Sequence, residues 1–440
     1  MGEKLMKIFS GFATTHVKTS SDMVIAGGIL PAFHNSKESS LDVTAVIFKN
    51  TIETVCLITC DNLMMDRTFI DDVITELEGR VGIPFNNFLV SSTHTHHAPS
   101  LMKIHGYGPD ERAKNEYKKA IFKAVEDALA NCMLSVVQFC NVDLFDVGAN
   151  SRRLLDNELI LWVPQLEEYL KFPPTGPYDP ELSICYITRT LPNGEEQYHG
   201  IWFNHSCHNI GALTVAQSPG FYGLAAQQLA AEFHCPVAFF SGASGSTHDF
   251  SRDTFSLIAK VKQAVCNQIS HDQKCKAPDS EYTGIQVIKE EFTYQVRMFD
   301  ETEEDDAVRK YCETMDISDC GDTEEVIKVF KDMRKHLHGL QGDTLKSWIQ
   351  VMSIGDVAVV GLPGEVFTSL GLEIKQKSPF KQTIIIQLAN DAIGYIPDEE
   401  SYSLGGYQLW TGYHSLLPKG TGEKLVDHAI SLLTKLKKDY

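Results

Sequence analysis

The sequence predicts an α/β protein in which mixed β-sheets are flanked by helices, within a single large domain that spans residues 1–440. Two observations support this fold class. Apolar runs of strand length alternate with segments whose apolar residues recur at helical spacing. No long linker or low-complexity tract separates these segments, and such alternation is typical of layered α/β folds. With 43% hydrophobic residues, the chain can bury a large core.

The predicted strands are short apolar runs bounded by polar or turn-forming residues. They span residues 43–48, 55–59, 88–90, 201–203, 237–240, 357–360 and 383–387. The predicted helices have an apolar face with a period near 3.6 residues. They span residues 68–79, 111–133, 219–233, 254–269 and 422–437, with another amphipathic helix after Glu365. Residues 300–340 are acidic and then helical in pattern, so we expect a helical excursion on the surface there.

Charge and cysteine usage exclude several classes of protein. A net charge of −19 argues against binding to nucleic acid or to an anionic membrane surface. No apolar stretch approaches the roughly 18 residues of a membrane span, and the N-terminus lacks a signal-peptide pattern. The 11 cysteines are scattered without a CxxC pair, which is typical of free thiols in a reducing compartment.

We therefore expect a cytoplasmic protein that acts on a small-molecule substrate, without nucleic acid and without stable membrane association. The sequence leaves the oligomeric state open, and a homo-oligomer is one of the alternatives.

The stretch SSTHTHHAPS at 91–100 places three histidines directly after a predicted strand. On an extended backbone His94 and His96 face the same side, because alternate residues of a strand do. Zinc accepts neutral imidazole and takes three or four protein ligands, so this pair can form half of a metal site. The alternative is a polar loop with exposed histidines.

Two further segments carry residues that can bind a metal. In WFNHSCHN at 202–209, His205 and His208 follow another apolar strand, with Cys207 between them as a soft ligand or a small buried residue. The loops at strand ends are where α/β proteins place their sites. In GLPGEVFTSLGLEIK at 361–375, Glu365 is either an anionic metal ligand or a favourable charge at the start of a helix.

Two loops complete the candidate site. The segment LANDAIGYIPDEESYSLGGYQ at 388–408 is a long loop of the kind that is usually functional, and it contains Tyr395, Tyr402 and Tyr407. The segment FFSGASGSTHDF at 239–250 has backbone N–H groups that could bind an anion. It lacks both the G-x-S-x-G spacing and a Walker motif, which argues against a serine hydrolase and a P-loop enzyme.

In this order, these segments resemble the catalytic domain of the neutral/alkaline (non-lysosomal) ceramidase family, over most of the chain. SGFATTHVKTS at 10–20 resembles the opening strand of the family, and FLVSSTHTHHAP resembles its T-S-T-H-T-H-S-G-P block. GANSRR resembles the N-R block, and DPELSICYITRTLPNGE followed by WFNHSCHN resembles the strand pair that leads to the second zinc histidine. GLPGEVFTSLG resembles the P-G-E block, and residues 388–408 resemble the L-A-N-x-x-x-G-Y-x-P…Y-x-x-G-G-Y-E block.

The resemblance implies a zinc-dependent hydrolase and a role for each matching residue. It implies that zinc is bound by His94, His208 and Glu365, with Tyr395 as a fourth ligand. His96 is then placed to transfer a proton to the leaving group, and Tyr407 and Arg152 to stabilise an oxyanion. His97 stands where the family usually has serine, and no role follows for it.

The sequence departs from the family pattern at three points. The active-site loop of the family, G-D-x-S-P, is replaced by residues 245–249, so that His248 stands at the serine position. Gln408 stands where glutamate is usual. The chain stops soon after its last predicted helix, so the immunoglobulin-like C-terminal domain of the family is not expected.

We therefore expect hydrolysis of an amide (N-acyl) bond in a soluble small molecule that is not ceramide. One alternative is a zinc hydrolase of an ester, lactone or glycosidic bond in a polar, sugar-like substrate, with a pocket reshaped by His248. The other alternative is a non-catalytic, metal-stabilised binding protein.

Overall fold

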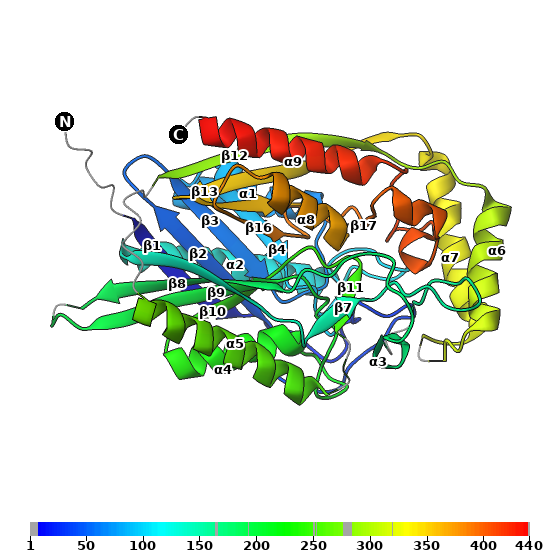
Figure 1. Cartoon of the computed structure of the whole chain (residues 1–440), viewed down its shortest axis with the longest axis horizontal. Coiled ribbons are helices and arrows are strands. Elements are labelled where there is room, and N and C mark those ends of the chain that lie inside the picture. Colours follow the sequence, from blue (N-terminus) through cyan, green and yellow to red (C-terminus); the bar gives the residue numbers. More distant parts are fainter. Residues whose placement is uncertain are drawn as a thin grey trace.

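The computed structural model of the chain describes residues 8–162, 166–191, 193–249, 251, 253–275, 284–318 and 320–438. The expectation that there is no signal peptide rests partly on residues 1–7, which lie outside the described residues. The predicted fold class is confirmed, because the described strands form mixed sheets that are flanked by helices (Figure 1).

Three large sheets make up the centre of the molecule. In spatial order, the first contains β4 (Phe88–Ser92), β3 (Thr54–Cys60), β2 (Asp42–Lys49), β1 (Phe9–His16) and β5 (Met133–Leu134). The second contains β10 (Val237–Ser241), β9 (Glu196–His205), β8 (Glu181–Thr190) and β6 (Val136–Asp143). The third contains β12 (Ile285–Gln295), β13 (Thr344–Ile354), β14 (Val357–Gly361) and β16 (Gln382–Ile386).

Each large sheet combines antiparallel pairing with one parallel pair, which is β3–β4, β9–β10 or β14–β16. Two small sheets complete the described strands: β11 (Thr247–Asp249) with β7 (Gly148–Asn150), and β15 (Glu365–Val366) with β17 (Tyr395–Ile396). Every predicted strand is present, in most cases one or two residues longer than its apolar run. The difference arises because polar residues at a strand end still form ladder hydrogen bonds.

The helices cover the outer faces of the three sheets. The first sheet is covered by α1 (Arg67–Val81) and α2 (Glu111–Ala130), and the second by α4 (Gly220–Phe233) and α5 (Thr254–Cys275). The third is covered by α8 (Thr368–Lys377) and α9 (Thr421–Lys438). In Figure 1, α9 lies along the top of the molecule and α4 and α5 along the bottom, with the sheets between them.

Helix α1 shows how local sequence sets such an element. The Asp66 carboxylate caps its N-terminus by accepting a hydrogen bond from the Phe69 amide, and Gly82 ends it with a left-handed φ of 73°. Its buried residues, Ile70, Val73, Ile74 and Leu77, lie on the predicted apolar face.

Residues 300–340 form α6 (Glu301–Thr314), α7 (Thr323–Leu337) and the 3₁₀ turn His338–Leu340. The two helices stand at one end of the molecule in Figure 1, beside the segment that follows β17. Their apolar faces pack against Leu155, Leu161 and Trp410. The remaining short elements are the helix α3 (Leu166–Tyr169) and the 3₁₀ turns Phe85–Asn87, Glu400–Ser403 and Tyr407–Leu409.

The inner faces of the three sheets share one hydrophobic core. Leu57 of the first sheet, Trp202 of the second and Ile384 of the third are each 0% exposed and belong to the same cluster. Strands that are buried on both faces are expected to read as continuous apolar runs, which is the pattern that identified them in the sequence. This shared core fixes the sheets relative to one another.

Apart from Cys320, the cysteines whose side chains the structure describes are free thiols, in agreement with the scattered cysteine pattern. Among the helices of the described ranges, none combines the length and apolar character that crossing a bilayer requires.

Gly200 of β9 packs against the Phe12 ring of β1, so it lies where the second sheet contacts the first. A Cβ atom at this position would lie 2.1 Å from the Phe12 ring of β1. We expect Gly200→Ala to lower the free energy of unfolding by about 1–3 kcal/mol, because the Phe12 ring is buried and would have to shift within the core. Gly79→Ala is the matched control: its Cβ would meet nothing within 4 Å, and the change in α1 should stabilise by about 0.5–1 kcal/mol. Urea denaturation of both variants checks the contrast, and a neutral Gly200→Ala would contradict it.

Candidate metal centre

Each of the three sheets sends one loop to the same point. His94 and His96 follow β4 of the first sheet, His208 follows β9 of the second, and Glu365 follows β14 of the third. A bridge between Thr95 and Asn209 holds the first two loops side by side. The sequence predicted that these groups meet at strand ends, and the structure brings them together.

The Glu365 carboxylate lies at the centre of this cluster. Its Oε2 atom is 3.2 Å from Nε2 of His94 and 3.2 Å from Nε2 of His208. The three side chains are 1–3% exposed. A buried carboxylate costs several kcal/mol unless a partner compensates its charge, so this arrangement demands a positive partner.

Backbone carbonyls fix the tautomers of both histidines. Nδ1–H of His94 donates to the Leu63 carbonyl at 3.0 Å, and Nδ1–H of His208 donates to the Ser244 and Thr247 carbonyls at 2.8 and 3.0 Å. Burial, and then the neighbouring His94, lower the pKa of His208, so the ring is neutral near pH 7. A neutral ring whose Nδ1 carries the proton directs the lone pair of Nε2 toward Glu365. Metal-bound histidines have this same support.

Four atoms of the cluster that could bind a metal have no hydrogen-bond partners among the described residues. These buried atoms are Nε2 of His94, His96 and His208, and Oε2 of Glu365. Unsatisfied buried polar atoms are rare and costly, so their convergence indicates a missing ligand. The nitrogens of His94, His96 and His208 lie within 4.8 Å of one another, and this group could hold a metal ion.

The spacing of the donors fits a tetrahedral ion. Two ligands at bond lengths of about 2.0–2.1 Å around a tetrahedral zinc are about 3.3 Å apart. The separations from the Glu365 oxygen to the two imidazole nitrogens are 3.2 Å. The residues present therefore fit a zinc ion.

The backbone at His94 has an uncommon conformation. Its φ of 62° is left-handed, which costs free energy for a residue other than glycine and is typical of functional sites. The backbone at Gly27 packs directly against His96, because a Cβ at Gly27 would lie 2.6 Å from the Cβ of His96. Gly27 has a φ of 120°, so glycine is required there for both reasons.

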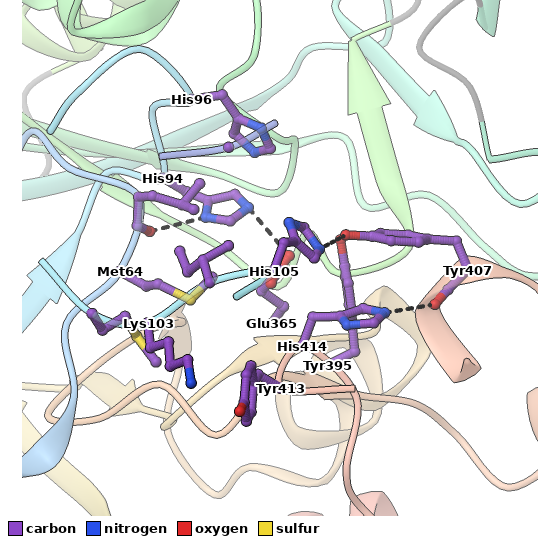
Figure 2. A pocket seen from close by; sticks show the side chains of 14 residues that line it. Met64, His94, His96, Lys103, His105, Glu365, Tyr395, Tyr407, Tyr413 and His414 are labelled. Atoms are coloured by element: carbon purple, nitrogen blue, oxygen red, sulfur yellow. Dashed lines mark hydrogen bonds and ion pairs between the residues drawn. The ribbon is translucent and has the colours of Figure 1, made fainter. Parts of the chain in front are cut away.

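A cavity of about 40 Å³ adjoins the cluster (Figure 2). The wall next to the cluster contains His94, His96, Glu365 and Tyr395, and the apolar wall contains Leu63, Met64, Met102 and Ile104. The remaining lining residues are Gly27, Lys103, His105, Tyr407, Tyr413 and His414.

Tyr395 lies next to Glu365 because their two short strands, β17 and β15, pair in register. Burial, followed by the negative charge of Glu365, raises the pKa of the Tyr395 hydroxyl well above its usual value. Tyr395 therefore lies beside Glu365 as a neutral phenol.

Arg152 and His248 are not among the residues that line the cavity, but they contact residues of the site. The Arg152 guanidinium donates to Oε1 of Gln408 at 2.9 Å and to the Gly405 carbonyl at 2.8 Å, which holds the loop that carries Tyr407. The His248 ring packs on the His208 ring with centroids 4.1 Å apart.

The other histidines of the two clusters are engaged elsewhere. His205 is a buried core residue whose ring nitrogens contact the hydroxyls of Tyr178 and Tyr222. His97 bonds to the Ile210 carbonyl at 2.6 Å. Cys207 is buried, and its thiol lies 3.6 Å from the His208 carbonyl.

Sequence reasoning missed His105 and His414, which line the cavity (Figure 2). Neither follows a predicted strand, so strand-end placement gave no signal. The one available signal near His105 was the segment HGYGP, whose two glycines, Gly106 and Gly108, adopt positive φ values of 91° and 72°.

Comparison with known proteins shows similarity in structure only. No protein-family model matches the sequence, and no curated protein is similar to it. The structure is similar to that of neutral ceramidase from Pseudomonas aeruginosa, with a TM-score of 0.72 and 13% identity, over 98% of this chain and 75% of that chain. It is also similar to a structure described as ceramidase complexed with C2, with a TM-score of 0.75 and 13% identity, over 99% of this chain and 76% of that chain. The expected ceramidase-like fold is confirmed.

Two histidines with a left-handed backbone conformation offer a matched test of metal binding. His94 has a φ of 62°, and His234, an exposed residue after α4, has a φ of 52°. Asparagine tolerates this conformation, so both His→Asn variants should fold. We expect His94→Asn to lower Zn²⁺ affinity more than about 100-fold, because the loss of a residue that merely supports a ligand already costs about 10–100-fold. His234→Asn should bind as the wild type does. Calorimetric titration with Zn²⁺ measures both, and equal affinities would refute the site.

Proposed function

We propose that this protein is a zinc-dependent hydrolase that cleaves an amide (N-acyl) bond in a small molecule other than ceramide. The observation that supports this most directly is the Glu365 oxygen shared by two imidazole nitrogens at 3.2 Å, next to a cavity. The likeness of the fold to two ceramidase structures agrees with the proposal.

In this proposal His94, His208 and Glu365 hold the zinc ion, and Tyr395 is the fourth ligand. Three side chains of this kind are the usual set in catalytic zinc sites. A bound zinc ion would supply a Lewis acid that activates water and polarises the carbonyl of the substrate.

His96 is the proposed proton carrier. It lines the cavity beside the metal ligands, and its Nε2 has no hydrogen-bond partner among the described residues. An imidazole in that position can accept a proton from the attacking water and return it to the leaving nitrogen. Gly27 packs against His96 and so holds the ring in place.

Arg152 and His248 are proposed to support the site without touching the substrate. Arg152 is 0% exposed, and its hydrogen bonds to Gln408 and Gly405 hold the loop that positions Tyr407. His248 packs on the His208 ring and so limits its rotation. In the resembled family, a serine stands at the position of His248.

The cavity supports the binding of a small acyl group beside the cluster. Its volume of about 40 Å³ exceeds the roughly 10–15 Å³ that one water molecule needs. The wall formed by Leu63, Met64, Met102 and Ile104 suits a short apolar acyl group.

We also propose a cytoplasmic location, which the free cysteines support.

Metal removal tests the proposal. We expect dialysis against a chelator to abolish hydrolysis of short N-acyl amides and one equivalent of Zn²⁺ to restore it, because the ligands are pre-formed. His96→Gln should retain the metal and lose about 10²–10⁴-fold in kcat, since it lacks only the proton carrier. His97→Gln, the neighbouring histidine outside the site, is the control and should keep its activity.

The same assay separates the alternatives. Turnover of esters, lactones or glycosides without turnover of amides would contradict the amidase proposal. It would favour the alternative of a zinc hydrolase of an ester, lactone or glycosidic bond. Stoichiometric zinc binding without turnover of any of these classes would favour the metal-stabilised binding protein.

A further inference from the structure

The ring of Tyr407 is held on both faces inside the cavity wall. It stacks on Trp162 with centroids 4.7 Å apart and an interplanar angle of 15°, and on His414 at 4.7 Å and 17°. Nε2–H of His414 also donates to the Tyr407 carbonyl at 3.2 Å. Ring and backbone are therefore both fixed, and the hydroxyl has one direction in which to point.

That hydroxyl contacts His105. Nε2 of His105 lies 3.1 Å from the Tyr407 oxygen, and Nδ1 of His105 lies 3.0 Å from the Gly28 carbonyl (Figure 2 shows the Tyr407 contact). The carbonyl can only accept, so Nδ1 must carry a proton. Burial lowers the pKa of His105 to about 4, so at neutral pH the ring has only that one proton. Nε2 is therefore the acceptor.

The direction of the hydrogen bond follows. Because Nδ1 of His105 carries the proton that bonds to the Gly28 carbonyl, the Tyr407 hydroxyl donates to Nε2 of His105. Its oxygen then has only lone pairs left for the cavity. This differs from the oxyanion-stabilising role implied by the sequence resemblance, because an oxyanion needs a donor.

We propose that Tyr407, oriented by His105, faces the substrate as a hydrogen-bond acceptor and selects secondary amides, which present an N–H group, over esters of the same shape. The proposal rests on the proposed function and specifies its substrate class. His105 is a positioning residue, since it acts on the substrate through Tyr407.

The geometry of an amide suits this arrangement. In a trans secondary amide the C=O and N–H bonds lie in the peptide plane and point in opposite directions. A substrate whose carbonyl faces Glu365 therefore directs its N–H away from the carbonyl oxygen, and Tyr407, which also lines the cavity, offers that N–H group an acceptor. An ester has an oxygen in place of the N–H group, and its lone pairs would face those of Tyr407. Sites built to hydrogen-bond an N–H group discriminate strongly against analogues that lack it.

Matched substrates test the proposal in the zinc-loaded full-length protein. The pair consists of an amide and an ester with the same short acyl group and the same leaving group, so that only N–H and O differ. We expect Tyr407→Phe to lower kcat/KM for the amide by about tenfold or more and to change that for the ester by less than about twofold. His105→Phe should reduce the amide-to-ester ratio in the same direction. Tyr402→Phe, in the same loop with its hydroxyl on the Leu417 carbonyl, should leave both unchanged. Equal losses on both substrates would overturn the proposal, because an oxyanion donor serves both.

A second measurement does not depend on turnover. In ¹⁵N-histidine-labelled protein, NMR distinguishes protonated from unprotonated ring nitrogens. We expect Nδ1 of His105 to be protonated and Nε2 unprotonated near pH 7, and the Nε2 signal to move in Tyr407→Phe. A protonated Nε2 would overturn the proposal even in an active enzyme. The predicted tautomer in a protein that hydrolyses neither substrate would instead contradict the proposed function.

Discussion

The structure depends above all on one buried carboxylate. Glu365 lies between two imidazoles, and its Oε2 is 3.2 Å from Nε2 of each. Nδ1 of each ring bonds to a backbone carbonyl, and the three facing atoms have no hydrogen-bond partner among the described residues. A cation between them would stabilise buried polar atoms that converge in this way. The rest of the fold is arranged so that these three groups meet.

The fold achieves this by packing three sheets around one core. The residues that converge follow β4, β9 and β14, one strand from each sheet, so their separation is set by the shared core and not by any one loop. Close backbone contacts tighten the arrangement. A Cβ at Gly245 would lie 2.3 Å from the Glu365 carbonyl, and one at Gly364 would lie 2.4 Å from that of Gly394. Side chains at these glycines would push the loop that carries Glu365 out of place, so the small residues are part of the site.

A second layer orients the groups around the cavity. Arg152 ties the loop of residues 405–408, and the stack of Trp162, Tyr407 and His414 fixes one wall of the pocket. The Gly28 carbonyl sets the tautomer of His105, and His105 in turn contacts the Tyr407 hydroxyl, so a backbone atom orients a polar group of the cavity wall. A hydrogen-bonded network of this kind makes its side chains rigid when every polar group in it has a partner.

The sequence alone determined the fold class, the strands that are buried on both faces and the main donors of the site, because long apolar runs and histidines directly after strands are local signals. It missed the longer strands β6, β12 and β13, since polar residues interrupt their apolar runs. It also missed His105 and His414, which reach the cavity from irregular loops. Only the tertiary structure decided which nitrogens face Glu365 and which partner takes the proton of Tyr407. These depend on contacts between residues up to 302 positions apart, and hydrogen-bond direction follows from such contacts and not from local sequence.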